Sequence, residues 1–173
     1  FDVSIDETGE STLFIFQDTI EDLDEADEVG LYDMAGIVDN QGNTGEILVG
    51  AGVWTGAQLE VVTIMSIDLS DFGGPILPGA VNGHSMVLRI WDLSGGTEYD
   101  ANYYINSGSG TFNGLFTAIN GISEASECGL ANCGCTDTQA CNYDPSADLD
   151  DGSCNYPDEQ MGYCDCVGNV EDC

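Results

Sequence analysis

The chain contains no lysine and a single arginine, Arg89, against 32 aspartates and glutamates, so its 173 residues carry a formal net charge of -31. Such a surface repels the phosphates of nucleic acids and lacks the basic patches that bind anionic membranes, which excludes both classes of partner. Repulsion among the carboxylates destabilises a compact state unless ions screen it. We therefore expect a saline medium, bound divalent cations, or both, and oxygen ligands favour Ca²⁺.

Long apolar segments are also absent, and none approaches the roughly 20 residues that a membrane-spanning helix requires, so we expect no membrane insertion. No signal peptide is visible, and the chain begins with Phe1 instead of methionine, as in a mature protein whose leader has been removed. The one histidine, His84, has no pattern of a serine or cysteine nucleophile near it. The sequence therefore contains no recognisable catalytic triad and predicts a protein that is not an enzyme.

Cysteine is missing from the first 127 residues, whereas the last 46 contain eight. They are Cys128, Cys133, Cys135, Cys141, Cys154, Cys164, Cys166 and Cys173. A segment this small buries too little apolar surface to fold unaided, so this density predicts a disulfide-stapled module and an extracellular or cell-surface location. A zinc site is the alternative, but the close pairs are CxC instead of CxxC and one histidine is available.

The cysteine-free part consists of short stretches of β-strand character. Apolar alternation or short apolar runs predict strands at residues 1–6, 12–20, 46–54, 58–67, 85–91, 98–105 and 114–119. Residues 55–57 are expected to close a hairpin, residues 107–110 to form a turn, and residues 19–28 to form a short helix or an acidic loop. The prediction is an all-β protein: an antiparallel, jelly-roll-like β-sandwich over residues 1–124, then a loop-rich, disulfide-rich module over residues 125–173.

Few side chains of the first part suggest a binding role. Trp54 and Trp91 lie in predicted strands and are expected in the core, although an exposed tryptophan would indicate sugar stacking. Arg89 is the only base among 32 acids, so we expect it to pair with a carboxylate, either Asp92 or Glu98.

Two acidic or polar segments are expected to be ordinary surface loops. Residues 21–28 form a run of charge that should face solvent. Residues 39–43 have the composition of a turn, and their alternative is a cation site shared with Asp33 or Glu46. Because acids are so abundant, no single pair of carboxylates identifies a glycoside hydrolase site.

The second part carries oxygen ligands at alternate positions. The acidic ones are Asp144, Asp148, Asp150 and Asp151, with Ser146 between the first two and Gly152 at the end. Alternating carboxylates around a glycine turn can wrap Ca²⁺, which is therefore the expected metal. The loop is not an EF-hand, because its twelfth position is Asn155 instead of glutamate. A hydrogen-bonded Asx turn stapled by Cys154 is the alternative.

The order of these motifs resembles a known family. The runs Gly-Cys-Thr-Asp at 134–137, Ala-Cys-Asn-Tyr-Asp-Pro at 140–145 and Asp-Asp-Gly-Ser-Cys at 150–154 are similar to the cysteine-rich modules of large secreted and cell-surface proteins of marine bacteria, many of the Bacteroidetes group. The resemblance covers about 40 residues. It implies an extracellular, non-enzymatic structural or adhesive role, and it implies that Cys135 pairs with Cys154.

The first residues suggest how copies of the chain assemble. Phe1, Val3 and Ile5 alternate with polar residues at a terminus, so this strand could complete the sheet of a neighbouring copy, or pair within its own sandwich. We expect a homo-oligomeric structural protein, the subunit of a surface filament or matrix. The alternatives are a carbohydrate- or surface-binding adhesion module and an accessory domain of a secreted hydrolase.

Overall fold

The computed structural model describes residues 1–125, 133–138, 140, 143–147 and 149–150. The chain divides into two compact units, Phe1–Glu124 and Ala125–Cys173, at the point where its composition changes. Each unit is described separately below. Within the described residues, no helix is long and apolar enough to cross a membrane.

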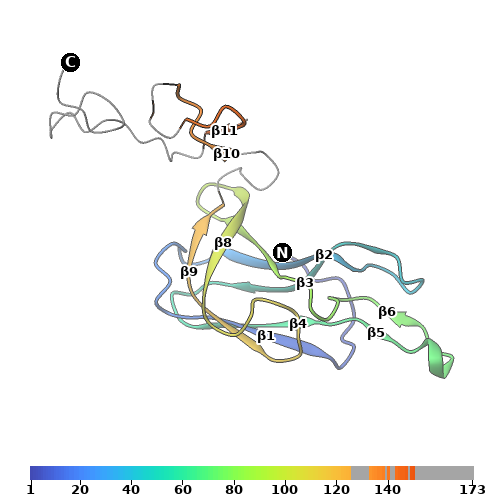
Figure 1. Ribbon diagram of the computed structural model, residues 1–173. Helices are drawn as coiled ribbons and strands as arrows, with labels where there is room; N and C mark the ends of the chain where they lie inside the picture. The colour runs from blue at the N-terminus through green and yellow to red at the C-terminus, as the bar shows by residue number, and fades with distance from the viewer. Residues whose placement is uncertain (126–132, 139, 141–142, 148, 151–173) are drawn as a thin grey trace, which may run out of the picture. The chain divides into compact units, whose positions relative to one another are not determined.

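A seven-stranded sheet forms the first unit (Figure 1). Its strands are β1 (Ser11–Phe16), β2 (Glu28–Ile37), β3 (Thr44–Val53), β4 (Leu59–Ile64), β7 (Val87–Asp92), β8 (Thr97–Ser107) and β9 (Phe116–Glu124). They are ordered β3-β2-β7-β8-β9-β1-β4. All neighbours are antiparallel except β1 and β9, which pair in parallel. The all-β prediction is confirmed, and the parallel pair makes the sheet a mixed one.

The period-two alternation of the strands separates a core face from an outer face. In β1, Phe14 and Phe16 are fully buried, whereas Leu13 and Ile15 on the other face are half-buried. In β7, Leu88 and Ile90 are fully buried in the same core. The strand predicted within residues 12–20 is therefore confirmed, and it ends at Phe16.

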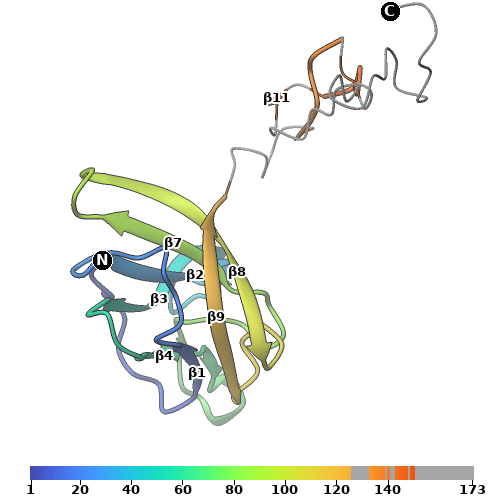
Figure 2. The same ribbon diagram turned by 90° about the vertical axis from the view of Figure 1, so that its left-hand side faces the viewer.

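The sheet curls until its two edge strands, β3 and β4, meet and nearly close it into a barrel (Figure 2). Glycines on the core face of β3 allow this approach, because a Cβ at Gly50 would lie 2.8 Å from Thr63 Cγ2. Residues 79–80, which we call the strap, join the two ends of the sheet. Gly79 exchanges two backbone hydrogen bonds with Ile37, the last residue of β2, and Ala80 bonds to the backbone of Ile64, the last residue of β4, and of Ser66.

The structure corrects the predicted hairpin at residues 46–67. Both strands form, but β3 pairs with β2 and β4 pairs with β1, so residues 54–58 connect opposite ends of the sheet. The turn residues 55–57 satisfied a hairpin pattern locally, whereas pairing was decided by the apolar neighbours β2 and β1. The turn expected near residues 107–110 does connect two paired strands, β8 and β9.

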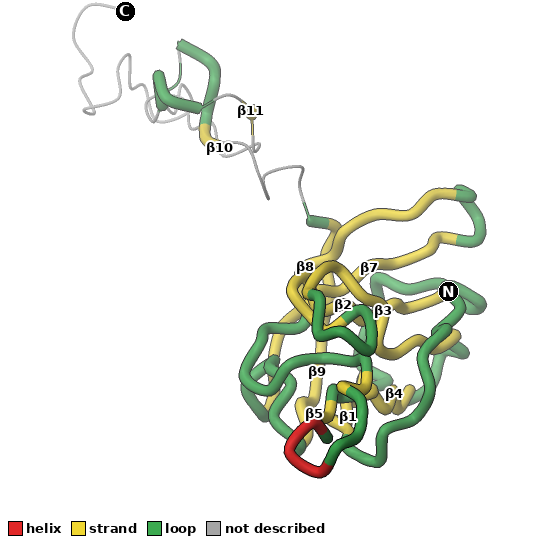
Figure 3. Tube along the Cα trace, turned by 90° about the vertical axis from the view of Figure 1, so that its right-hand side faces the viewer, coloured by secondary structure: helices red, strands yellow, loops and turns green. Residues whose placement is uncertain are grey.

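Two further predictions about secondary structure are resolved. Residues 19–28 form an irregular acidic loop and not a helix, apart from Glu28, which begins β2. Residues 1–6 form no strand, so the strand predicted there is wrong. A short two-stranded ribbon of β5 (Ile67–Asp68) and β6 (Ile76–Leu77) carries the 3-10 helix η1 (Ser70–Phe72) at its tip (Figure 3).

In the second unit, β10 (Cys133–Gly134) and β11 (Leu149–Asp150) pair in parallel. Cys135 is buried, is disulfide-bonded and forms a backbone bridge with Tyr143. The partner sulfur belongs to a side chain outside the described ones, so the pairing with Cys154 stays a prediction. The remaining predicted disulfide residues also lie outside them, and of Cys133 the structure describes the backbone.

Candidate functional site

The N-terminal arm, residues 1–8, links the two ends of the sheet by side-chain contacts. Its first residue lies on β2, and Thr8 Oγ1 donates a 2.6 Å hydrogen bond to the carbonyl of Met65, which follows β4. Between them, Ile5 packs against the hydrophobic core. Within the described part of the chain, residues 1–7 make no backbone-to-backbone hydrogen bond. The arm is therefore attached to the sheet without being part of it.

Phe1 occupies a slot on the outer face of β2. Gly30 forms the floor, since a Cβ there would lie 3.0 Å from the Phe1 ring. Tyr32 forms a wall, with its ring centroid 6.1 Å from that of Phe1 and the planes at 79°, an edge-to-face contact. The Glu28 carboxylate accepts a hydrogen bond from the N-terminal ammonium. The Phe1 side chain is only 7% exposed, so the slot removes most of an aromatic ring from water.

An ion cluster on the same outer face holds the wall of the slot in place. The Arg89 guanidinium lies 4.5 Å from the centroid of the Tyr32 ring, a cation–π contact. It donates to both oxygens of Glu46, at 2.6 and 3.2 Å, and to Asp100 at 2.9 Å. These hydrogen bonds raise the pKa of Arg89, against the opposing effect of burial. Of the two predicted partners, Glu98 is the more distant member of the cluster, with its Oε1 3.9 Å from Arg89 Nη1. Asp92 does not pair with Arg89.

The pKa of Tyr32 is raised above its ordinary value, chiefly because burial disfavours the phenolate and also because Glu98 is near. Asp92 instead caps the β7–β8 turn, where its carboxylate accepts from the backbone of Gly95 and the hydroxyl of Ser94. These bonds lower the pKa of Asp92, with the Gly95 amide as the largest cause. Sequence reasoning missed Glu46 and Asp100 because they approach Arg89 across strands.

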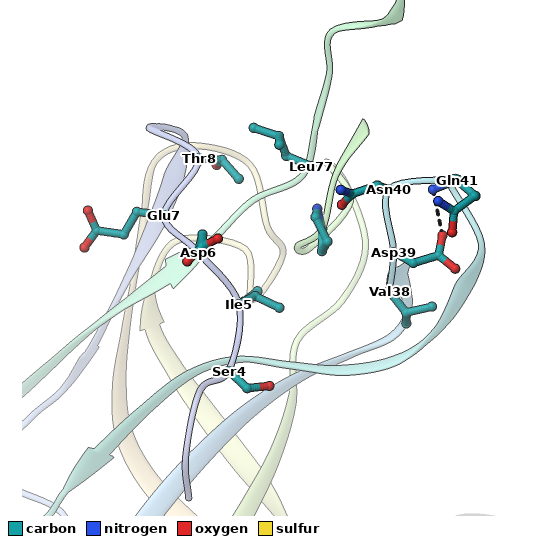
Figure 4. Close-up of a pocket in the computed structure, with 11 residues that line it drawn as sticks. Ser4, Ile5, Asp6, Glu7, Thr8, Val38, Asp39, Asn40, Gln41 and Leu77 are labelled. Carbon is teal, nitrogen blue, oxygen red and sulfur yellow. Dashed lines mark hydrogen bonds between the residues drawn. The ribbon is translucent and has the colours of Figure 1, made fainter. Parts of the chain in front are cut away.

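The arm also forms one wall of an open groove of about 580 Å³ (Figure 4). Its other walls are the β2–β3 turn, residues 38–41, and residues 77–78 at the end of β6. The Asp39 carboxylate accepts from the Gln41 and Asn43 amides of that turn, and the pKa of Asp39 is lowered chiefly by the Asn43 side-chain amide. The turn prediction is thus confirmed, and the Asp33 carboxylate, one of the two groups that might have shared a cation with this turn, bonds instead to Ala35, Val81 and His84.

Asp33 is a buried carboxylate that clamps the strap. Its oxygens accept from the backbone of Val81, next to the strap, at 2.8 Å and from the backbone of Ala35 at 2.9 Å. His84 Nδ1 lies 2.9 Å from the same carboxylate. The contact with Asp33 orients the ring of His84, the only histidine of the chain. The arrangement positions a loop, and the described residues near it show no third catalytic group.

Hinge geometry separates the arm from the sheet. Gly9, between Thr8 and β1, has a positive φ of 93° and no atom within 4 Å of the position a Cβ would take. Left-handed backbone of this kind favours glycine. The chain therefore turns at Gly9, between the arm and β1, in a conformation that favours glycine.

The two tryptophans have different environments. Trp54 is 2% exposed and belongs to the core, as predicted. Trp91 is half-buried and points to the outer face of β7, in register with Glu28 on one side and Glu98 on the other. The core prediction for Trp91 is therefore wrong, because the strand alternation places Ile90 inward instead.

Exposed apolar side chains gather where the chain has no charge. Residues 101–123 contain no acid or base. They include Tyr104, Leu115 and Phe116, each about half exposed or more. Phe116 also continues a cross-strand row through Leu13 of β1 to the exposed Val62 of β4. A row of exposed and half-buried apolar side chains of this kind is typical of contact surfaces.

In the second unit, the structure describes one of the four predicted calcium ligands in full. Asp144 Oδ1 accepts from the backbone amide of Ser146 at 2.8 Å and from its hydroxyl at 2.6 Å, and these bonds lower the pKa of Asp144. The bonds form an Asx turn. Asp148 and Asp151 lie outside the described residues, and of Asp150 the backbone is described. Among described residues, no group of three or more metal-binding side chains is present.

Comparison with known proteins gives little that bears on the site. No protein-family model matches the chain, and no curated protein matches it. Among solved structures, the chain is similar to a 9R-lipoxygenase from Cyanothece PCC8801, with a TM-score of 0.27 and 13% sequence identity. The alignment covers 73% of this chain and 16% of that one. A TM-score this low carries no argument about fold or activity.

Proposed function

We propose that the chain is an extracellular structural protein, the subunit of a surface filament or matrix whose copies assemble by exchanging the N-terminal arm. The observation that carries the proposal is the attachment of the arm. It is fixed by an aromatic ring, an aliphatic side chain and a hydroxyl, and it adjoins a glycine hinge. Contacts of this kind are the same whether the arm belongs to its own sheet or to that of a neighbour.

Head-to-tail exchange of this type generates rings where the rotation between copies closes, and filaments where it does not. We propose filaments. The apolar row of Phe116, Leu13 and Val62 supports assembly independently, because exposed apolar side chains are typical of contact surfaces. The charge of -31 still opposes contact between copies. Assembly should therefore strengthen with ionic strength, since at 0.1 M salt the screening length is about 10 Å.

The second unit fits the same setting. We propose that its eight cysteines are paired in disulfides and that its carboxylates bind Ca²⁺. Both features suit an oxidising, extracellular medium. The module would then stabilise the tail of each subunit without contributing catalysis.

Electron microscopy of the oxidised chain in high and low salt tests the proposal. Regular polymers that shorten or disappear at low salt support it. A chain lacking residues 1–7 should give folded monomers, with the native circular dichroism spectrum, that do not polymerise. If that truncated chain forms the same polymers as the full chain, arm exchange is wrong.

A second candidate function, carbohydrate binding, rests on the half-buried Trp91 between two carboxylates on the outer face. Aromatic rings beside carboxylates are common in sugar sites, where the ring stacks on the sugar and the acid accepts its hydroxyls. Quenching of tryptophan fluorescence by a soluble polysaccharide, lost in Trp91→Ala but kept in Tyr104→Ala, would favour this candidate over the structural one.

A further inference from the structure

The slot on the outer face of β2 has the features of a recognition site and not only of a packing contact. We propose that it recognises an aromatic side chain of an extended peptide, and that in an assembly its occupant is Phe1 of a second copy. This inference rests on the proposed function and specifies the partner of the same site.

Gly30 is the first observation that supports it. Its φ is not positive, so the backbone of β2 at this point is open to any residue. Glycine in a strand interior loses stability because it has no side chain to pack. The structural requirement for glycine at this point is the ring of Phe1, which approaches to 3.0 Å of the position a Cβ would take. The floor of the slot therefore has the shape of an aromatic ring.

The walls are fixed by contacts that do not involve the arm. Tyr32 is held by the Arg89 guanidinium, and Arg89 is held by Glu46 of β3 and Asp100 of β8. Four neighbouring strands thus set the position of the Tyr32 ring. A site formed in this way persists when the arm leaves, and a preformed site binds without the cost of ordering its side chains.

The occupant is defined by the arm that the structure shows in the slot. An aromatic residue comes first, and alternate residues Val3 and Ile5 are partly buried, whereas Asp2, Ser4 and Asp6 are exposed. Extended peptides are recognised in this way, with specificity coming from pockets for alternate side chains. The ligand class is therefore an extended acidic peptide with an aromatic residue followed by aliphatic residues at every second position.

The test uses the full oxidised chain carrying Phe1→Ala, which empties its own slot. The probe is a fluorescent peptide of the sequence of residues 1–8, labelled at its carboxyl end, and its binding is measured by fluorescence anisotropy. We expect saturable binding, at least tenfold weaker binding of the same peptide with alanine at its first position, and nearly full binding with tyrosine there.

A second substitution in the acceptor locates the site. Gly30→Leu, added to Phe1→Ala, fills the slot from the outer face and should abolish binding while leaving the circular dichroism spectrum unchanged. Asn120→Leu is the matched control, because it adds the same side chain at an exposed position of β9, and it should leave the affinity unchanged.

The outcomes separate the slot from the filament. Equal affinity for the phenylalanine and alanine peptides overturns the slot, even if the wild-type chain polymerises. Binding that survives Gly30→Leu also overturns it, as does no binding to a folded acceptor. If the peptide binds with the expected specificity but the wild-type chain never polymerises, the slot stands and the proposed filament is wrong.

Discussion

Replacing Asp33 by alanine should destabilise the first unit more than any other single substitution of an acidic residue. The Asp33 side chain is 2% exposed, and its carboxylate accepts from two backbone amides and from His84 Nδ1. Alanine leaves these donors without an acceptor where water has little access. A buried, unsatisfied donor costs about 1–3 kcal/mol, so we expect a loss of about 3 kcal/mol.

For a domain of this size, 1 kcal/mol shifts the melting temperature by about 3–4 °C, so Asp33→Ala should lower it by about 10 °C. Differential scanning calorimetry measures this shift, and urea titration gives the free energy of unfolding. Asp33→Asn should lose less, because the amide keeps one oxygen acceptor. Asp39→Ala is the matched control: its carboxylate also accepts amides in a turn, but it is fully exposed.

A double-mutant cycle with His84→Ala then isolates the contribution of the pair. If the Asp33–His84 contact helps to hold the strap, the two substitutions together should cost less than the sum of their separate costs, by about 1 kcal/mol. A melting temperature of Asp33→Ala within about 2 °C of the wild type would refute the reasoning that this carboxylate clamps the strap.

Three further outcomes are expected. The Asp92 carboxyl should titrate by NMR below the ordinary aspartate range, because the Gly95 amide and the Ser94 hydroxyl stabilise its ionised form. Since the pKa of Asp92 is lower in the folded state, its contribution to stability is complete above about pH 4 and is lost as the pH falls through the folded-state pKa. A titration in the ordinary aspartate range would contradict this prediction. Alkylation of the native chain followed by mass spectrometry should find no free thiol, and four or more alkylated cysteines would disprove the disulfide module. Ca²⁺ should raise the melting temperature, since an ion that binds only the folded state stabilises it; if EDTA changes neither this temperature nor the protease resistance of the tail, there is no calcium site.

Much of the fold is predictable because burial of alternate side chains dominates strand formation. Phe14 and Phe16, and Leu88 and Ile90, are apolar at every second position and are fully buried in the core. The same pattern failed at residues 1–6, where alternation reflects contacts of an arm instead of strand pairing. Periodicity reports which side chains are covered, and it does not report what covers them.

Strand order was less predictable than strand position. The turn at residues 55–57 suggested a hairpin, yet β3 and β4 lie at opposite ends of the order. Turn composition is a local signal, whereas closure of the sheet depends on small residues such as Gly50 that admit a distant strand. Sequence alone does not show that Gly50 will face Thr63.

The candidate site was only partly visible in the sequence. The sequence predicted Phe1 and Ile5 as residues of a strand, whereas the structure shows them as side-chain contacts of an arm that forms no strand. Gly30 gave no signal, because a glycine in an apolar segment is ordinary. Of the partners of Arg89, Glu98 was predicted, whereas Glu46, 43 residues away in the chain, and Asp100 were missed. Contacts across strands become visible when the register is known.

Subunit complementation tests the central claim, exchange of the arm between copies, most directly. One partner is the full chain with Gly30→Leu, which has an arm but a blocked slot, and the other lacks residues 1–7 and has an open slot but no arm. Neither should polymerise alone. Mixed, they should form a one-to-one complex by analytical ultracentrifugation that stops at the dimer, because the arm of the first occupies the slot of the second. If two folded partners remain monomers when mixed while the wild-type chain polymerises, the arm is not the linking element, and the account is contradicted.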